Sequence, residues 1–325
     1  MAKRSSVPAR HAPRFPAFTG VFPPGCTAYV MGQYGVQSAA DATHETAAAE
    51  MRERFRSASR PDVVDRGSFT DSSGLTNTVW FAYWLEPARH RSWVAEGQRS
   101  APFQEAGWWW EEALIPVEAT ETLHTHRQDQ YPTSGLAEIL DQEPTELHDY
   151  WGSARDRMRN SSAPPTRGAA LEIHDSTVDV VVEGGICLIR TAQDWSGSSV
   201  FRLPFLQKVQ PVKKRGVAYL GEHPETGCIC TREISEQDMD GRLLDRACTV
   251  AWFVSLDHLL SWTHFHETHL RIYRSFFSML HEEQSPLDVA LWHEVSVLPP
   301  GSVRARYVGC HPDTGLLPLG LSRHE

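Results

Sequence analysis

"TVWFAYWLEPARHRSW" (78–93) has a counterpart later in the chain, "TVAWFVSLDHLLSW" (249–262). Each stretch starts with β-branched and aromatic residues typical of a strand, then turns, and continues into a helical segment that carries Ser-Trp. Two similar stretches so far apart predict a duplicated unit that mixes strands and helices. A solenoid is excluded, because its repeats are much shorter than this spacing.

A second pair of segments supports the duplication. "WEEALIPV" (110–117) and "WHEVSVLP" (292–299) follow the first pair in the same order. In this alignment His293 stands where the earlier segment has Glu111, so the second copy carries an imidazole in place of a carboxylate. The pattern predicts the α+β fold class and a second copy that has been specialised.

The polar, proline-rich stretch "RNSSAPPTRG" (159–168) separates the two copies. We therefore expect one domain, residues 25–325, made of diverged halves at about 25–165 and 166–325. Residues 1–24 are rich in proline and lack periodicity, which predicts an N-terminal tail.

The composition limits the possible partners. The chain has 325 residues, of which 41% are hydrophobic and 22% charged, and this balance is ordinary for a globular protein with a large core. The net charge of −10 without a long basic tract argues against nucleic acid as a partner. Apolar runs stay below the roughly 18 residues of a membrane span, and the start lacks the apolar core of a signal peptide. We therefore expect no membrane contact and a cytoplasmic location.

"SWTHFHETHLRIYRSFF" (261–277) brings three histidines among large apolar residues. Steps of three or four predict a helix with His266 and His269 on its apolar face. One possibility is that these are ordinary buried histidines. The second is a zinc site, although His266-Glu267-Thr268-His269 is one residue short of HExxH. The third is a non-covalent haem with one axial imidazole, because the CxxCH signature of attached haem is absent from the sequence.

Segments spread over nearly the whole chain resemble the haem-containing aldoxime dehydratases, also called phenylacetaldoxime dehydratases. The matching segments, in the family's order, are "YVMGQYGVQ" (29–37), "YWGSARDRM" (150–158), "CLIRTAQDW" (187–195), "THFHETHLRIY" (263–273), "LWHEVSVLP" (291–299) and "YVGCHPDTGLLP" (307–318). The resemblance implies duplicated ferredoxin-like units in an α+β barrel that holds haem b, often as a homodimer. It also implies conversion of R–CH=N–OH to R–C≡N and water, with ferrous iron in the active form.

The resemblance further implies roles for individual residues. His269 matches the proximal ligand of the haem iron, and His293 matches the distal acid and base. Thr191 matches a serine that binds the oxime, so the hydroxyl is kept and a methyl group is added, and Ala192 replaces the glycine beside it.

An arginine of the family's distal site falls in the segment that contains Arg155 and Arg157, of which we favour Arg155. Glu121 matches a glutamate of the same site. Two other classes would share the proximal histidine. A peroxidase-like or dismutase-like haem enzyme would not need Thr191 together with His293, and a haem sensor or carrier would need neither.

Overall fold

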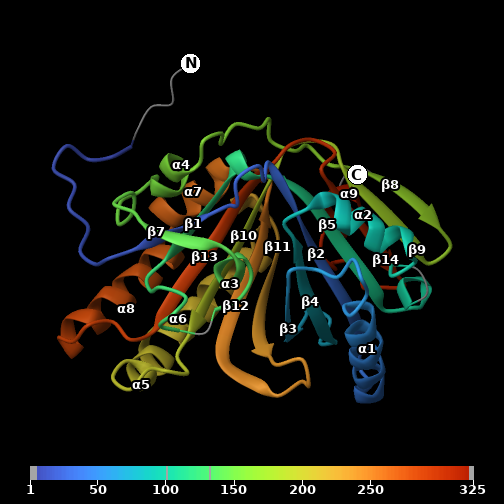
Figure 1. Ribbon diagram of the computed structural model, residues 1–325, viewed down its shortest axis with the longest axis horizontal. Helices are drawn as coiled ribbons and strands as arrows, with labels where there is room; N and C mark the ends of the chain where they lie inside the picture. Colours follow the sequence, from blue (N-terminus) through green and yellow to red (C-terminus); the bar gives the residue numbers. More distant parts are fainter. Residues whose placement is uncertain (1–5, 100–101, 132, 322–325) are drawn as a thin grey trace.

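The computed structural model describes residues 6–99, 102–131 and 133–321 (Figure 1). The strands form one large antiparallel sheet of 14 strands in the order β7-β1-β6-β13-β10-β12-β11-β3-β4-β2-β5-β14-β9-β8. The prediction of an α+β protein is therefore confirmed.

Four strands and two helices of the first half follow one another as strand, helix, strand, strand, helix, strand. They are β2 (Ala28–Ser38), α1 (Asp41–Arg54), β3 (Val63–Thr70), β4 (Thr76–Trp84), α2 (Pro87–Ala95) and β5 (Trp108–Pro116). In the sheet these strands lie side by side as β5-β2-β4-β3.

The second half has the same succession, with the last helix split in two. Its elements are β10 (Ile186–Asp194), α6 (Gln210–Glu222), β11 (Cys228–Gln237), β12 (Leu243–Phe253), α7 (Leu256–Phe265), α8 (Glu267–Glu283) and β13 (Ala290–Leu298). Their order, β13-β10-β12-β11, corresponds strand for strand to that of the first half, and β11 pairs with β3 to join the two sets.

Shorter elements extend the sheet at both sides. The strands are β1 (Phe18–Val21), β6 (Thr120–His124), β7 (Asp141–Pro144), β8 (Ala169–His174), β9 (Thr177–Val182) and β14 (Val303–Val308). The short helices are α3 (Leu136–Ile139), α4 (Ser153–Arg157), α5 (Arg202–Pro204) and α9 (Leu317–Leu321), and a π-helical turn, Phe205–Val209, leads into α6. β1 pairs with β6 and β7, so part of the segment predicted as a tail belongs to the sheet.

The sheet folds over so that one face of the first half packs against one face of the second. Side chains from both halves meet there: Trp252 donates to Glu111 over 3.0 Å, and Tyr83 donates to Glu294 over 2.9 Å. A single apolar cluster contains residues of both halves, such as Phe81 and Trp252. We call this contact the inner core.

The two outer faces carry the helices, with α1 and α2 on the first half and α6, α7 and α8 on the second (Figure 1). The first outer face is filled by large rings, listed here: Tyr34, Phe55, Trp80, Trp84, Trp93, Phe103, Trp108 and Trp110. In the sequence repeat Trp80 corresponds to Ala251. Ala251 lines a cavity on the second outer face, so a small residue leaves open the space that an indole fills in the first half.

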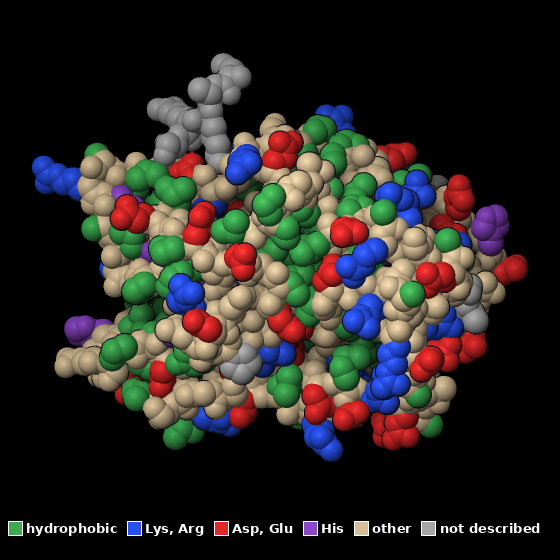
Figure 2. Space-filling view, viewed as in Figure 1, with side chains coloured by type: hydrophobic (Ala, Val, Ile, Leu, Met, Phe, Trp, Pro, Cys, Tyr) green, Lys and Arg blue, Asp and Glu red, His purple; other side chains and the backbone are tan. Residues whose placement is uncertain are grey.

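The surface carries charge of both signs. On the face shown in Figure 2, acidic and basic side chains are interspersed around apolar ones. Among the residues that the structure describes, no helix combines the length and apolarity needed to cross a membrane.

The inner core also buries charge. The Arg232 and Glu111 side chains are 3% and 0% exposed and form an ion pair, to which Tyr307 adds a hydrogen bond of 2.7 Å. Arg190 binds Asp65 and Glu236 in the same layer. Burial raises the pKa of Glu294 to about 7, although nearby Arg190 lowers it.

We expect Arg232→Met to lower the free energy of unfolding by about 3–5 kcal/mol, because Glu111 would stay buried without its partner. Urea unfolding followed by tryptophan fluorescence measures this. Arg306→Met is the control, since the Arg306–Asp179 pair is about a third exposed and such pairs contribute about 1 kcal/mol or less. Equal effects of the two substitutions would contradict the role given to the buried pair.

Candidate functional site

A cavity of about 430 Å³ lies between the outer face of the second half and the helices α6, α7 and α8. Its size falls in the range of ligand sites, about 300–1,000 Å³. Most of the lining is apolar: Phe205, Val217, Leu220, Ala251, Phe253, Leu260, Ile272, Phe276 and Val295 belong to it. Such a lining suits a large, flat, hydrophobic ligand.

His269 lies on α8 and lines the helical side of this cavity. Trp262 packs edge-on against its ring at 4.8 Å between centroids. Burial lowers the pKa of His269 to about 4, so its imidazole is neutral near pH 7 and has a lone pair to give to a metal. Its Nδ1 is buried on the side away from solvent and has no hydrogen-bond partner among the described residues.

The helix that carries His269 does not run through the whole histidine segment. His266 has an extended backbone (φ −83°, ψ 132°) and is the N-cap of α8, where its side chain accepts a hydrogen bond from the backbone of Thr268. The predicted continuous helix, with His266 and His269 on one face, is therefore wrong at this residue. The described residues contain no group of three or more His, Cys, Asp or Glu side chains placed to hold a metal ion, as the zinc alternative would require.

His293 and Thr191 line the opposite, sheet side of the cavity. They lie on the neighbouring strands β13 and β10 and are paired directly in the register of the sheet. Arg157, from α4, lines the same part, and its Nη2 lies 3.2 Å from His293 Nε2. Three of the predicted site residues thus meet opposite His269.

Glu121 lies behind His293 and Arg157. Its carboxylate is fully buried, accepts a hydrogen bond of 2.7 Å from Arg157 Nε, and lies 3.0 Å from His293 Nε2. Burial raises the pKa of Glu121, but the charges of Arg157 and His293 outweigh this and lower it to about 2. The carboxylate is therefore charged at any pH at which the protein would work.

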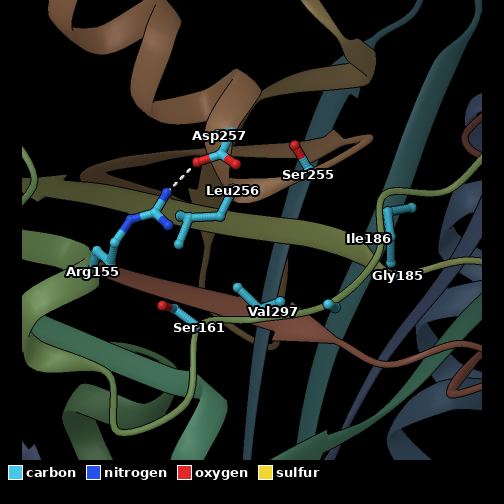
Figure 3. Close-up of a pocket in the computed structure, with 9 residues that line it drawn as sticks. Arg155, Ser161, Gly185, Ile186, Ser255, Leu256, Asp257 and Val297 are labelled. Atoms are coloured by element: carbon cyan, nitrogen blue, oxygen red, sulfur yellow. Dashed lines mark hydrogen bonds and ion pairs between the residues drawn. The ribbon is translucent and has the colours of Figure 1, made fainter. Parts of the chain in front are cut away.

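Arg155 does not join this group. Its guanidinium forms an ion pair with Asp257 and lines a separate cavity of about 20 Å³ (Figure 3). Side chains two positions apart on a helix point to different sides, so only one of the two arginines of α4 can face the large cavity. The structure places Arg157 there, whereas the sequence analysis favoured Arg155.

The sequence alignment of His293 with Glu111 also needs correction. Glu111 faces the inner core and is paired with Gln33 of β2. In the second half Trp292, Glu294 and Ser296 face the inner core, and the strand registers make Ser296 the counterpart of Glu111. His293 lies three residues before Ser296 and points to the outer face, because successive side chains of a strand alternate.

Sequence reasoning missed a second polar group in the cavity. Lys213 of α6 lines it together with Gln193 and Thr249. A signal was present: Val209, Lys213, Val217 and Leu220 recur at helical spacing, which places a lysine on an apolar face.

The cavity fits the haem that the resemblance implies. A neutral, buried imidazole lies at one wall of an apolar cavity, and polar groups lie at the other, as a haem with one protein ligand and a distal site requires. The residues that would hold the group are His269 and the apolar lining.

Comparison with known proteins agrees with this fit. Residues 32–316 match the family model described as haem-containing dehydratase. The chain is 34% identical to a phenylacetaldoxime dehydratase of Bacillus sp. (strain OxB-1), covering 97% of this chain and 94% of the relative. It is 33% identical to an aliphatic aldoxime dehydratase of Pseudomonas chlororaphis, covering 96% and 93%.

A crystal structure of an aldoxime dehydratase in complex with butyraldoxime superposes with a TM-score of 0.88 at 27% identity, over 98% of this chain and 93% of the other. The match to the family model covers most of the chain, and the relatives match nearly all of it. The chain therefore belongs to the haem-containing dehydratases.

Proposed function

We propose that the protein is an aldoxime dehydratase, a carbon–nitrogen lyase that converts R–CH=N–OH to R–C≡N and water with haem b. The observation that carries this proposal is that one cavity has a neutral imidazole, His269, at its helical wall and the Thr191, His293 and Arg157 group at its sheet wall. The names of the relatives support the same reaction.

The reaction needs a proton on the leaving oxygen, because hydroxide leaves poorly from nitrogen. His293 would donate this proton as the N–O bond breaks, and its neutral ring would then remove the proton from the oxime carbon. The products are the nitrile and water, and His293 returns to its starting state. When bound by His269, ferrous haem would supply a metal centre and electron density for cleavage of the N–O bond.

The other polar residues would hold the oxime and the acid in place. Thr191 offers a hydroxyl next to His293, where it can bind the oxime oxygen. Glu121 accepts from Arg157 and lies beside His293, so it would fix both groups in place. Arg157 would bind the oxime hydroxyl and keep it in line with the proton donor.

We also infer that the fold is a duplication of a ferredoxin-like unit within an α+β barrel, with halves at about 25–165 and 166–325. The identical strand orders of the two sets support this inference. We propose further that the protein is a cytoplasmic homodimer, as its resemblance to the family implies. Light scattering during gel filtration would test the oligomeric state.

The test of the function is nitrile formation from an aldoxime by the haem-loaded, dithionite-reduced protein. We expect turnover with reduced iron and little with oxidised iron. Peroxidase or chlorite-dismuting activity without nitrile would indicate a different haem enzyme, and haem binding without turnover would indicate a sensor or carrier.

His269→Ala should abolish tight haem binding, because the variant lacks the imidazole that faces the cavity. His264→Ala is the matched control, since His264 stacks on Trp151 and is outside the cavity lining. Titration of the apoprotein with haem, followed by absorbance, gives both affinities. The axial assignment would be wrong if His264→Ala lost haem and His269→Ala kept it.

His293→Ala should keep haem and fold but lose at least about 10²-fold in turnover, the lower end of a general acid's contribution. The measurement is nitrile formation at saturating aldoxime by the reduced holoprotein. Thr191→Ser, which keeps the hydroxyl, should stay active and shows that small changes beside His293 are tolerated. A rate for His293→Ala within a few-fold of the parent would remove His293 from the mechanism.

Arg157→Met should lower turnover by about 10²–10³-fold, since it removes donors aimed at the reacting group. Arg155→Met makes the same chemical change in the same helix and should leave turnover within about twofold. Both proteins should be compared at equal haem occupancy. The opposite ranking would restore the assignment made from the sequence alone.

A further inference from the structure

Lys213 is an unusual residue for an apolar cavity. It projects from α6, its side chain is 9% exposed, and it lines the cavity between Val209 and Val217. Its Nζ donates to Gln193 Oε1 over 2.5 Å and lies 3.0 Å from the carboxylate of Glu233. Burial of an ammonium is costly unless the charge is paired. The partners Gln193 and Glu233 compensate this cost, so Lys213 is held inside the cavity by specific contacts.

Lys213, Gln193 and Thr249 form a polar group that can make hydrogen bonds to a ligand in the cavity. An ammonium has three N–H donors, of which one goes to Gln193, while the carboxylate of Glu233 lies near it as an ion pair. The amide of Gln193 accepts through its oxygen and still has two N–H donors of its own. Thr249 gives its hydroxyl proton to Glu233 over 2.5 Å, which leaves its oxygen as an acceptor. The cavity therefore meets donors from Lys213 and Gln193, and one acceptor from Thr249.

The charge of the group favours an uncharged ligand. Glu233 already balances Lys213, so a carboxylate bound there would add an uncompensated negative charge in a buried place. A hydroxyl, ether or carbonyl oxygen would accept from the ammonium without this cost.

The position of the group relates it to the proposed reaction centre. Thr249 is paired with Thr191 in the register of β12 and β10. Gln193 lies two residues beyond Thr191 on the same face of β10, about 7 Å along the strand. A substrate whose oxime end lies at Thr191 and His293 would reach Lys213 with a side chain about as long as a para-substituted phenyl ring.

We propose that Lys213, with Gln193 and Thr249, binds an uncharged oxygen at the far end of the substrate's side chain. This inference rests on the proposed function and gives it a substrate class: aldoximes whose side chain ends in a hydroxyl or similar oxygen. Apolar aldoximes of the same shape are accepted less well.

The experiment compares para-hydroxyphenylacetaldoxime with para-methylphenylacetaldoxime, which differ by a hydroxyl and a methyl group of similar size. The reduced holoprotein should prefer the hydroxylated compound by at least about tenfold in kcat/KM, as expected for a hydrogen bond to a charged donor. Lys213→Met should reduce this ratio to about one. Lys214→Met, which removes the exposed neighbouring charge, should keep it.

Two additions keep the result interpretable. Lys213→Met/Glu233→Gln removes both charges, so the ratio can be measured even if Lys213→Met alone fails to fold with Glu233 unpaired. Dissociation constants of both compounds, from the absorbance of the oxidised holoprotein, report binding without turnover and should show the same preference and the same loss.

The outcomes separate the two proposals. Equal efficiencies for both compounds in the parent, or a preference that survives in both Lys213 variants, would overturn the role of Lys213. A loss of haem affinity in Lys213→Met with the preference unchanged would mean that Lys213 serves the cofactor, and would overturn it too. Absence of nitrile from either compound would contradict the proposed function, while the dissociation constants would still decide for or against Lys213.

Discussion

The buried carboxylate of Glu121 is the constraint on which the candidate site depends. A charge without solvent must be balanced by partners at short range, and Arg157 and His293 are those partners. They come from α4 and from β13, which are separated from β6 in the sequence. One carboxylate thus fixes where a short helix lies relative to the sheet and which way a histidine points, and it brings both to the wall opposite His269.

The two halves show how a duplicated architecture can keep its inner core and change an outer face. The inner core uses matching strands of both halves and joins them through buried pairs such as Arg232–Glu111. The first outer face is packed solid with aromatic rings, whereas the second has Ala251 where the repeat has Trp80. Because of the cavity, the second half lacks packing contacts that the first half has, and a bound cofactor would replace them.

Part of this was predictable from the sequence and part was not. The α+β class and the equivalence of 78–93 with 249–262 follow from local patterns, and His269 and His293 follow from motifs that stay contiguous. The choice between Arg155 and Arg157 could not be predicted from local patterns. It depends on the rotation of α4 about its axis, and the contacts of these arginines with Asp257 and Glu121 set that rotation. The alignment of His293 with Glu111 was wrong by three residues, and an odd shift turns every side chain of a strand to the other face. The break at His266 was missed because histidine is not among the usual N-cap residues.

The cations that line the cavity are balanced by carboxylates. The guanidinium of Arg157, which carries a full positive charge, lies 3.2 Å from the ring of His293. Glu121 cancels that charge because its pKa of about 2 keeps it ionised. Lys213 and Glu233 form a second pair of this kind elsewhere in the lining. Arg157 and Lys213 are thus each balanced by a neighbouring carboxylate. Their remaining N–H donors can face a ligand, while the cavity gains little net charge. An apolar cavity can then bind a hydrophobic group and still offer hydrogen-bond donors at chosen points of its wall.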